Sequence, residues 1–374
     1  MQRRQWLRRL AGWVAAGGSG SLFAQPGSDD EEVSPQRRLR FPRDHGAHLG
    51  TRIEWWYATG WLGTPEAPSH GFQLTFFRSG TGLGQQQSGR FVPRHLLFAH
   101  AAVTSLVERR HQHAKRLTRW NGQADAGAGF ASVQDAALRL GHAADRAWTL
   151  TRQATHWQAR LPTPDFSLDL KLQRTQPLLL QGDQGYSRKG PDAGQASHYY
   201  SEPQLAVSGS LREQTSGPLL PVQGVAWLDH EWSQQILHPQ AVGWDWVGMN
   251  LFDGGALTAF VLRRQDGSVL WGGGSFRAAG DKERSFTPDA LRMRPGRRWM
   301  SPATGARYPM EWQLECPAGR FSVRSLLDAQ ELDSRQSIGT AYWEGLSELL
   351  DSSGKRVGLG YLEMTGYSGR LQMG

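Results

Sequence analysis

The stretch VAWLDHEWSQQILHPQAVGWDWVGMNLFD, residues 225–253, holds the densest group of acidic and large aromatic side chains in the sequence. Its first part alternates in character with a period of two, which is typical of a half-buried β-strand. This alternation places Asp229 and Glu231 on one face of the predicted strand and His230 and Trp232 on the other. A polar link over residues 233–240 then leads to a second extended run.

The second run carries an acid between large aromatic residues. Asp245 shares one face with Val247, whereas Trp244 and Trp246 share the opposite face. A carboxylate on an otherwise apolar face lies either at the solvated end of a strand or at a position where its charge is used. The two runs therefore predict two strands that present candidate functional residues.

The composition is that of a folded protein with many strands. The chain has 374 residues, of which 39% are hydrophobic and 20% are charged, which is typical of a globular protein rather than a disordered one. Its 45 glycines and 16 tryptophans suit short strands joined by tight turns around aromatic interiors. We find no sustained helical periodicity, and the best helical candidate is the Ala-rich region 132–140.

Many antiparallel strands with few short helices predict an all-β protein built from barrels or sandwiches. A length of 374 residues is more natural for two barrel-like domains than for one. We place the boundary in the polar link. This division gives an N-terminal barrel over residues 41–235 and a C-terminal barrel over residues 236–374.

The N-terminus has the features of an export signal. The run QRRQWLR, residues 2–8, resembles the twin-arginine export motif, and a weakly apolar Gly-rich stretch continues to Ala24. We therefore predict a signal peptide over residues 1–24 and a flexible leader over residues 25–40. These segments imply a periplasmic or secreted protein with the twin-arginine export machinery as a partner.

The charge and cysteine content exclude several classes of protein. The formal net charge is +8, but Arg3, Arg4, Arg8 and Arg9 of the predicted signal peptide supply four of those charges. We therefore expect no nucleic-acid partner. The single cysteine, Cys316, excludes an intramolecular disulfide, as suits a protein exported in the folded state. We expect a monomer.

Common catalytic motifs are incomplete in this chain. His230 and Glu231 begin the zinc-protease pattern HExxH, but position 234 is Gln rather than His. The segment GYSRKG, residues 185–190, misses the GxSxG pattern of serine hydrolases by one residue. No phosphate-binding or dinucleotide-binding glycine pattern lies between a strand and a helix, so we predict no cofactor. Metal binding is possible at His111 and His113, but we select no metal ligand.

Eight segments, taken together and in order, resemble one family. It comprises the AttH-like proteins, often labelled "predicted secreted hydrolase", which are related to the carotenoid 1,2-hydratases. The resemblance covers the chain from roughly residue 40 to residue 370, and it implies two tandem lipocalin-like β-barrels of the calycin type. The segments are FPRDHGAH (41–48), EWWYATGWL (54–62), QGDQGYSRKG (181–190), SHYYSEP (197–203), WLDHEWS (227–233), GWDW (243–246), YWEG (342–345) and GYLEMTGY (360–367).

The resemblance also carries an expectation about chemistry. The hydratases add water to an isolated alkene of a long terpenoid, and other relatives in fungi hydrate or cyclise hydrophobic natural products. The His-x-Trp pair implicated in hydratase catalysis matches His230 and Trp232. A later Tyr-x-Asp pair of the hydratases has no counterpart, because the nearby segment 257–259 reads Leu-Thr-Ala. The resemblance thus implies a lipophilic small-molecule ligand but argues against carotenoid hydration itself.

Hydration of an alkene needs an acid that protonates carbon, a surface that tolerates a cation, and a base that takes a proton from water. Burial can raise the pKa of a carboxyl group until it is able to donate a proton near neutral pH. A Trp face stabilises a cation by about 0.5–2 kcal/mol. We select Asp229, His230 and Asp245 as candidate catalytic residues. The candidate substrate-binding residues are Trp232, Trp244, Trp246, Glu54, Trp56, Tyr57 and Tyr199.

Alternatives remain open at this point. Asp229 or Asp245 could accept hydrogen bonds from Trp indoles in a purely structural role. The protein could be a non-catalytic periplasmic carrier of lipophiles, a partner of a membrane transporter, or a hydrolase of unknown substrate. If the protein is an enzyme, carboxyl and imidazole groups should converge inside an accessible pocket. A carrier instead predicts an apolar pocket, with those groups held in fixed hydrogen bonds outside it.

Overall fold

The computed structural model describes residues 32–83, 92–123, 129–141, 143, 145–214, 216–235, 237–335 and 339–370. The predicted signal peptide, residues 1–24, lies outside these ranges. The described residues are mostly in β-strands, with short 3-10 turns such as η2 (Arg43–His45) and η4 (Pro288–Ala290). No helix within these ranges is long and apolar enough to cross a membrane. The all-β prediction is therefore confirmed.

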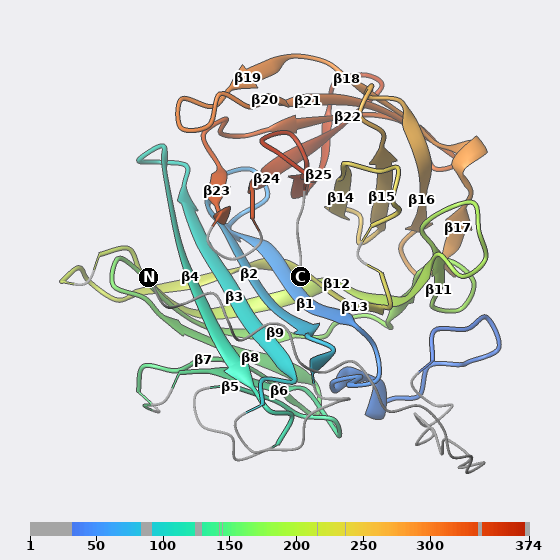
Figure 1. Cartoon of the computed structure of the whole chain (residues 1–374). Helices are drawn as coiled ribbons and strands as arrows, with labels where there is room; N and C mark the ends of the chain where they lie inside the picture. The colour runs from blue at the N-terminus through green and yellow to red at the C-terminus, as the bar shows by residue number, and fades with distance from the viewer. Residues whose placement is uncertain are drawn as a thin grey trace, which may run out of the picture.

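The first thirteen strands form one antiparallel sheet that curls into a nearly closed barrel (Figure 1). The strand order is β4-β3-β2-β1-β13-β12-β9-β8-β7-β6-β5, and β10 and β11 pair with β12. At the seam between β4 and β5, the Thr118 side chain lies against Gly129. The strands are β1 (Ile53–Gly63), β2 (Pro68–Gly80), β3 (His95–Ser105), β4 (Arg110–Trp120), β5 (Gly129–Ala131), β6 (Ala137–Leu140), β7 (Trp148–Gln153), β8 (His156–Pro162), β9 (Ser167–Gln173), β10 (Leu179–Leu180), β11 (Tyr186–Arg188), β12 (Ala196–Arg212) and β13 (Leu220–Ser233).

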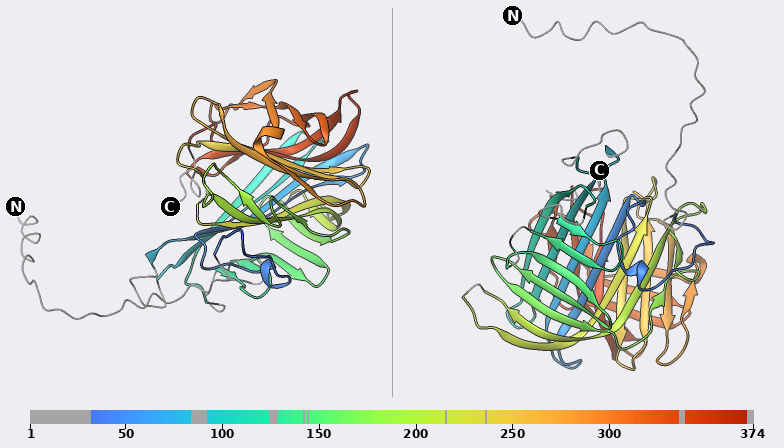
Figure 2. Two further views of the ribbon diagram at one scale, coloured as in Figure 1. Left: turned by 90° about the vertical axis from the view of Figure 1, so that its right-hand side faces the viewer. Right: turned by 90° about the horizontal axis from the view of Figure 1, so that it is seen from below.

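The second sheet is a half-barrel that packs against one side of the first (Figure 2). Its strand order is β17-β16-β15-β14-β25-β24-β22-β21-β18, with β23 on β24, while β19 and β20 form a separate pair. The strands are β14 (Gly243–Leu251), β15 (Ala256–Arg263), β16 (Val269–Arg277), β17 (Arg284–Phe286), β18 (Arg292–Pro295), β19 (Arg298–Met300), β20 (Arg307–Pro309), β21 (Glu311–Cys316), β22 (Gly319–Ser325), β23 (Glu331–Asp333), β24 (Ala341–Asp351) and β25 (Arg356–Met364).

Each sheet has its own apolar core, and a further apolar cluster lies between the sheets. Trp56 and Trp157 are buried inside the first barrel, and Met249 and Trp343 are buried on the inner face of the second sheet. The cluster between the sheets includes Tyr57, Trp61, Trp227, Trp246 and Phe260. Strands β1 and β13 are consequently buried on both faces, because the second sheet covers the outer face of the barrel.

Residues 132–140, the best helical candidate in the sequence, do not form a helix. Residues 137–140 form β6, which pairs with β7. Leu138 and Leu140 are buried, whereas Ala137 and Arg139 between them are only half-buried. This burial has a period of two, so packing against the barrel core overrides the helical preference of the alanines.

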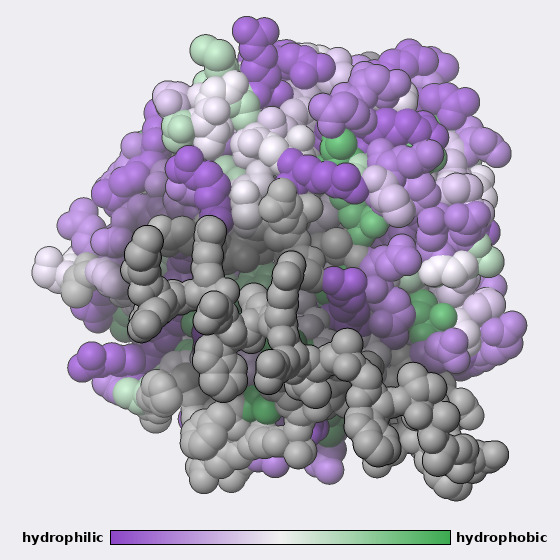
Figure 3. All heavy atoms as spheres, in the orientation of Figure 1, coloured by the Kyte–Doolittle hydropathy of each residue, from purple (hydrophilic) through white to green (hydrophobic). Residues whose placement is uncertain are grey.

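Exposed hydrophobic side chains are scattered over the surface. On the face drawn in Figure 3, hydrophilic residues predominate and hydrophobic ones appear only in small areas. Large exposed hydrophobic residues such as Val107, Leu219 and Met300 come from separate turns and strands. Isolated residues of this kind are normal on soluble surfaces. The apolar feature that calls for an explanation is therefore the space between the two sheets.

Candidate functional site

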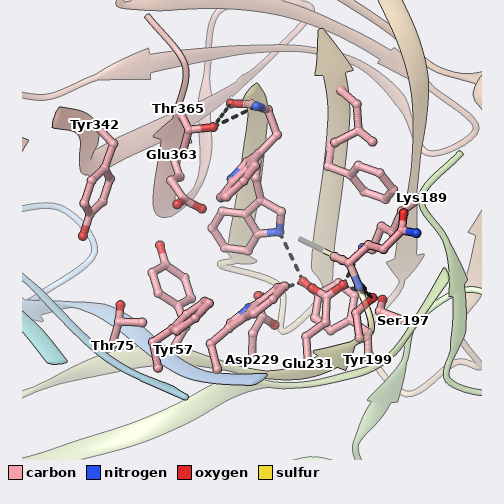
Figure 4. A pocket seen from close by; sticks show the side chains of 18 of the residues that line it. Tyr57, Thr75, Lys189, Ser197, Tyr199, Asp229, Glu231, Tyr342, Glu363 and Thr365 are labelled. Atoms are coloured by element: carbon pink, nitrogen blue, oxygen red, sulfur yellow. Dashed lines mark hydrogen bonds and ion pairs between the residues drawn. The ribbon is translucent and has the colours of Figure 1, made fainter. Parts of the chain in front are cut away.

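A large cavity lies between the two sheets, and we call it the inter-sheet cleft. One wall is the outer face of the barrel at β1, β2, β3, β12 and β13, and the other is formed by β14, β15, β24 and β25. The cleft has an empty volume of about 1110 Å³, part of which is open to solvent. Figure 4 shows side chains from both sheets pointing into it. A concave space lined mainly by aromatic side chains with a few polar groups has the character of a small-molecule site.

Strand alternation decides which side chains reach the cleft. On β13, Asp229 lines the cleft, while the ring of His230 points into the barrel and stacks on Trp56 at 4.5 Å between ring centroids. On β14, Trp246 lines the cleft, while Asp245 lies on the opposite face. The alternation predicted for residues 225–253 is confirmed. It also means that Asp229 and His230, although adjacent in sequence, face different compartments.

The carboxyl group of Asp229 accepts three hydrogen bonds. Ser201 Oγ donates to Oδ1 at 2.5 Å, Trp227 Nε1 donates to Oδ1 at 2.6 Å, and Tyr199 OH donates to Oδ2 at 2.7 Å. Burial raises the pKa of Asp229 to about 7, against the opposing effect of the three donors. Asp229 can therefore gain or lose a proton near neutral pH.

Two further donors fix the direction of these hydrogen bonds. Gln181 Nε2 donates to Ser201 Oγ at 2.8 Å, and Trp246 Nε1 donates to Tyr199 OH at 3.2 Å. Because each hydroxyl already accepts a hydrogen bond from its own donor, its proton is directed toward Asp229. Groups from both sheets thus hold the Asp229 carboxyl in one orientation.

A cation lies at one side of the cleft. Lys189 Nζ is 3.0 Å from Glu231 Oε1, and it stands over the rings of Tyr199 at 4.7 Å and Phe260 at 4.2 Å. Ser197 Oγ donates a hydrogen bond of 2.5 Å to the same Glu231 oxygen. The positive charge of Lys189 thus compensates the negative charge of Glu231. This ion pair distinguishes Glu231 from Asp229, two residues earlier.

One further carboxyl group enters the cleft from the second sheet, and another lies beside it. Glu363 on β25 lines the cleft, and its directly opposite partner on β24 is Glu344, which is 2% exposed. Burial raises the pKa of Glu363 to about 7. Burial, together with the nearby Glu363 carboxyl, holds the pKa of Glu344 well above its usual range.

The remaining walls are aromatic. Trp55 stacks on Phe77 with 5.8 Å between ring centroids, and Phe77 stacks on Phe98 at 4.5 Å, so that three neighbouring strands present a continuous ring surface. Trp246 and Phe260 line the cleft from the second sheet. Such ring faces bury apolar ligand surface and also stabilise a positive charge.

His230 belongs to a separate group of side chains inside the barrel, which we call the buried polar cluster. Its centre is Glu54: His230 Nε2 lies 2.9 Å and His48 Nδ1 2.7 Å from Glu54 Oε1. Arg78 Nε donates to Glu54 Oε2 at 2.9 Å, and all four side chains are fully buried. Burial lowers the pKa of His230 to about 4, so its imidazole is neutral at pH 7.

The buried polar cluster is not well suited to a metal ion. Its two imidazoles and one carboxylate offer ligand atoms within 4.8 Å of one another. However, Arg78 already neutralises Glu54, so a divalent cation would place uncompensated charge in the barrel interior. In the part of the chain that the structure describes, this is the only group of three such residues. His111 and His113, the candidates from the sequence, therefore have no third ligand there.

Asp245 is directed away from the cleft. It is fully buried on the face of β14 that carries the core of the second sheet. Arg263 Nε donates to its Oδ2 at 2.6 Å, and Tyr367 OH donates to its Oδ1 at 3.0 Å. Although burial raises the pKa of Asp245 to about 6, Arg263 favours its ionised form. Asp245 therefore has hydrogen-bond partners that differ from those of Asp229.

The structure thus divides the residues selected from the sequence among three places. Asp229, Tyr57, Tyr199, Trp244 and Trp246 line the inter-sheet cleft. His230, Trp232, Glu54 and Trp56 lie inside the barrel, and Asp245 lies behind the second sheet.

Glu363 and Lys189 also line the cleft but were not selected. The sequence signal for Glu363 was its place in an otherwise apolar alternating strand, within the segment GYLEMTGY.

The family of the chain follows from comparison with known proteins. A model of the AttH-like family matches residues 32–367. The chain belongs to the AttH-like family. A candidate AttH protein of Nitrosomonas europaea has 41% sequence identity and a TM-score of 0.81, and the match covers 90% of this chain and 98% of that chain. No curated protein matches the sequence.

More distant structural neighbours share the fold of this AttH-like protein. Kievitone hydratase from Nectria haematococca has 13% identity and a TM-score of 0.65, with coverage of 91% of this chain and 97% of that chain. CghA with Sch210972 has 13% identity and a TM-score of 0.52, with coverage of 83% and 87%. At such identities the likeness shows the fold alone. The prediction of two tandem lipocalin-like barrels is confirmed, with the second barrel present as a half-barrel.

Replacing Glu363 with glutamine will change how the stability of this AttH-like protein depends on pH. The pKa of Glu363 is about 7 in the folded state, against 4.5 for an ordinary glutamate. Between these values the folded state binds more protons than the unfolded state, so wild-type stability falls as pH rises through this window. Glutamine has no proton to lose. The free energy of unfolding of Glu363→Gln, taken relative to that of wild type at the same pH, should therefore increase by up to about 3 kcal/mol between pH 4.5 and pH 7.

Denaturant unfolding at a series of pH values measures this difference. Glu348→Gln is the matched control on β24, because the Glu348 carboxylate is paired with Arg324 and Arg356, and it should show no such gain. Parallel stability curves for wild type and Glu363→Gln would show that Glu363 ionises as it does in the unfolded chain.

Proposed function

We propose that the protein binds a lipophilic small molecule in the inter-sheet cleft and adds water to one of its carbon–carbon double bonds. The observation that carries the proposal is the pair of carboxyl groups, Asp229 and Glu363, which face one aromatic cleft from opposite sheets (Figure 4). Burial raises the pKa of each to about 7. Each can therefore hold or release a proton at neutral pH, as acid–base catalysis requires.

The aromatic walls support the proposed type of ligand. Large ring faces such as Trp246 and the Trp55, Phe77 and Phe98 surface can bury the apolar surface of a ligand. Protonation of an alkene creates a carbocation, and the same ring faces stabilise positive charge by about 0.5–2 kcal/mol each. One surface would thus serve both binding and catalysis.

In this proposal His230 has a positioning role. It lies next to Asp229 on β13, and its Nε2 is 2.9 Å from Glu54 Oε1 on β1. This contact ties the two strands that present Asp229 and Tyr57 to the cleft. Loss of His230 would disturb the site from behind without removing a group that touches the ligand. The hydratase among the structural neighbours supports the type of reaction by analogy of fold.

Ligand capture with a blocked cleft tests the proposal. The probe is the neutral fluorophore N-phenyl-1-naphthylamine, together with mass spectrometry of lipophiles that copurify with the protein. Thr75 is half-buried in the cleft wall, so Thr75→Trp should fill the space and abolish both signals. Thr149→Trp on β7, also half-buried but outside the cleft, is the matched control and should keep them.

The chemical form of the captured lipophile separates the enzyme from the carrier. We expect wild type to hold a hydrated product and Asp229→Asn to hold its unsaturated precursor. Identical unmodified lipids in both would overturn hydration in favour of carriage, and capture that survives Thr75→Trp would overturn the cleft as the binding site.

A further inference from the structure

The acids Glu344 and Glu363 are direct cross-strand neighbours. They are opposite residues in the antiparallel pairing of β24 with β25, so their Cβ atoms are about 4.5–5.5 Å apart on one face of the sheet. Both lie in segments that resemble the family, YWEG and GYLEMTGY. Glu344 is buried and Glu363 is half-buried. Like charges directly opposite each other destabilise a sheet, so this pair calls for a chemical explanation.

The groups around the Glu344–Glu363 pair do not compensate the negative charge that the pair would carry if ionised. The charged groups that act on Glu363 include Asp229 and Glu231 on β13 and Asp245 on β14, all of which are acids. The hydrogen-bond donor to Glu363 is Trp244, which is uncharged. Lys189, the cation of the cleft, pairs instead with Glu231 at 3.0 Å. Two carboxylates so placed cannot both ionise, and the pair must retain a proton.

An incompletely bonded phenol lies beside the same acids. The Tyr57 side chain is 6% exposed and lines the cleft. Its hydroxyl is directed at the Glu344 carboxyl, which Tyr342 also contacts, but the Tyr57 hydroxyl and Glu344 Oε1 have no hydrogen bond of full geometry within the described residues. Figure 4 shows Tyr57 and Glu363 directed toward one another across the cleft. A buried polar group left in this way indicates a position where a ligand or water belongs.

We propose that the Glu344–Glu363 pair shares a proton and that Glu363 donates it to the double bond, while Asp229 receives a proton from water. This inference rests on the proposed function and assigns its acid and base. The second sheet would supply the acid, and the barrel would supply the base, so that the reaction requires both halves of the chain.

The hydrogen bonds separate the two roles. Asp229 accepts three hydrogen bonds from Ser201, Trp227 and Tyr199, with their protons directed toward it. Such an arrangement stabilises a carboxylate, which is the form a base needs. Glu363 lacks an equivalent set of donors and faces Glu344, which favours the protonated form. The two groups therefore differ in environment as an acid and a base should.

The step balances without any further reactant. The O–H bond of Glu363 breaks and a C–H bond forms at one alkene carbon, leaving a carbocation at the other. The oxygen of water forms a C–O bond to that cation, and Asp229 takes the released proton. One turnover adds H and OH to the ligand and moves one proton from Glu363 to Asp229. Exchange with solvent through the open cleft resets both groups.

Isotope-edited infrared spectroscopy of the full chain tests the protonation directly. With glutamate carrying a ¹³C-labelled carboxyl group, the carbonyl stretch of protonated Glu is followed from about pH 5 to pH 9, a range above the usual Glu pKa of about 4.3. Aspartates such as Asp229 carry no label and do not contribute. In wild type we expect one component of this band, from Glu363, to titrate near pH 7 and a second, from Glu344, to remain protonated to higher pH.

Two variants test the coupling. In Glu363→Gln the carboxylate that opposes ionisation of Glu344 is removed, so the component that stays protonated above pH 7 should be lost at lower pH than in wild type. In Glu348→Gln, whose carboxylate is paired with arginines in the same sheet, both components should stay in place. An unchanged high-pH component in Glu363→Gln would overturn the pair.

The assignment of the acid is tested separately from the proposed function. Hydration of the captured lipophile should fall at least about 100-fold in Glu363→Gln, the usual scale of a lost general acid. Unchanged hydration in that variant would overturn the inference alone. Failure of wild type to capture or hydrate any lipophile would instead overturn the proposed function, and the infrared result would still report the state of the pair.

Discussion

Replacing Arg78 with methionine will lower the free energy of unfolding by about 3–5 kcal/mol, the usual cost of leaving one partner of a buried ion pair without the other. Arg78 is fully buried inside the barrel, where its Nε contacts Glu54 Oε2 at 2.9 Å. Although burial alone would raise the pKa of Glu54, Arg78 and His48 hold it well below its usual range. Without Arg78, folding would have to bury a carboxylate alone or protonate it.

The Arg78→Met substitution also removes hydrogen bonds outside the ion pair. Arg78 Nη2 also donates to the carbonyl oxygens of His48 and Thr51 at 2.7 and 3.0 Å. These contacts join the segment before β1 to β2, so their removal leaves buried acceptors unsatisfied. Chemical denaturation with a check of unchanged m-value measures the effect.

A matched control is the exposed pair Arg297–Asp328. Arg297 contacts Asp328 through two nitrogens rather than one, but the two side chains are 46% and 32% exposed. Arg297→Met should therefore cost no more than about 1 kcal/mol. The double variant Glu54→Gln/Arg78→Met should recover part of the loss of Arg78→Met, because no charge is then left alone. If Arg78→Met costs no more than Arg297→Met, the buried polar cluster does not stabilise the barrel as described.

The second large effect is expected at Asp229. Asp229→Asn should reduce hydration of the captured lipophile by about 100-fold to 10,000-fold, the range for loss of a general base. Asparagine keeps the shape of the side chain but replaces one acceptor oxygen with an NH₂ group. Because Ser201, Trp227 and Tyr199 all donate toward this position, the amide cannot satisfy them all.

The ratio of hydrated to unsaturated lipophile in the copurified protein measures this effect. Ser201→Ala, which removes one donor and leaves the carboxyl group, is the graded control and should have a smaller effect. Thermal unfolding and probe capture show whether Asp229→Asn still folds and binds. A variant that binds and hydrates like wild type would exclude Asp229 as the base.

Much of the fold could be predicted from local patterns. The alternation in residues 225–253 correctly placed Asp229 and His230 on opposite faces of one strand, and Trp246 and Asp245 on opposite faces of another. Glycine and tryptophan content, with the absence of helical periodicity, indicated an all-β chain. Local patterns failed at residues 132–140, because the pairing of β6 with β7 outweighs the helical preference of alanine.

The composition of the site could not be predicted in the same way. Proximity in sequence grouped Asp229 with His230, but the sheet itself separates the cleft from the barrel interior. The outer face of β13 borders a ligand-sized space only because the second sheet packs over it, and this is a matter of tertiary packing. Glu363 joins Asp229 through the pairing of β25 with β14 and the stacking of the two sheets. Such long-range contacts leave no local signal apart from an acid on an apolar strand.

The most direct test of the central claim is the position of the ligand. A crystal structure of the protein with its copurified lipophile should show the molecule in the inter-sheet cleft, against Trp246 and within reach of the Asp229 and Glu363 carboxyl groups. Density for the lipophile inside the barrel, beside His230 and Trp232, would contradict this account and would return the chemistry to the buried polar cluster.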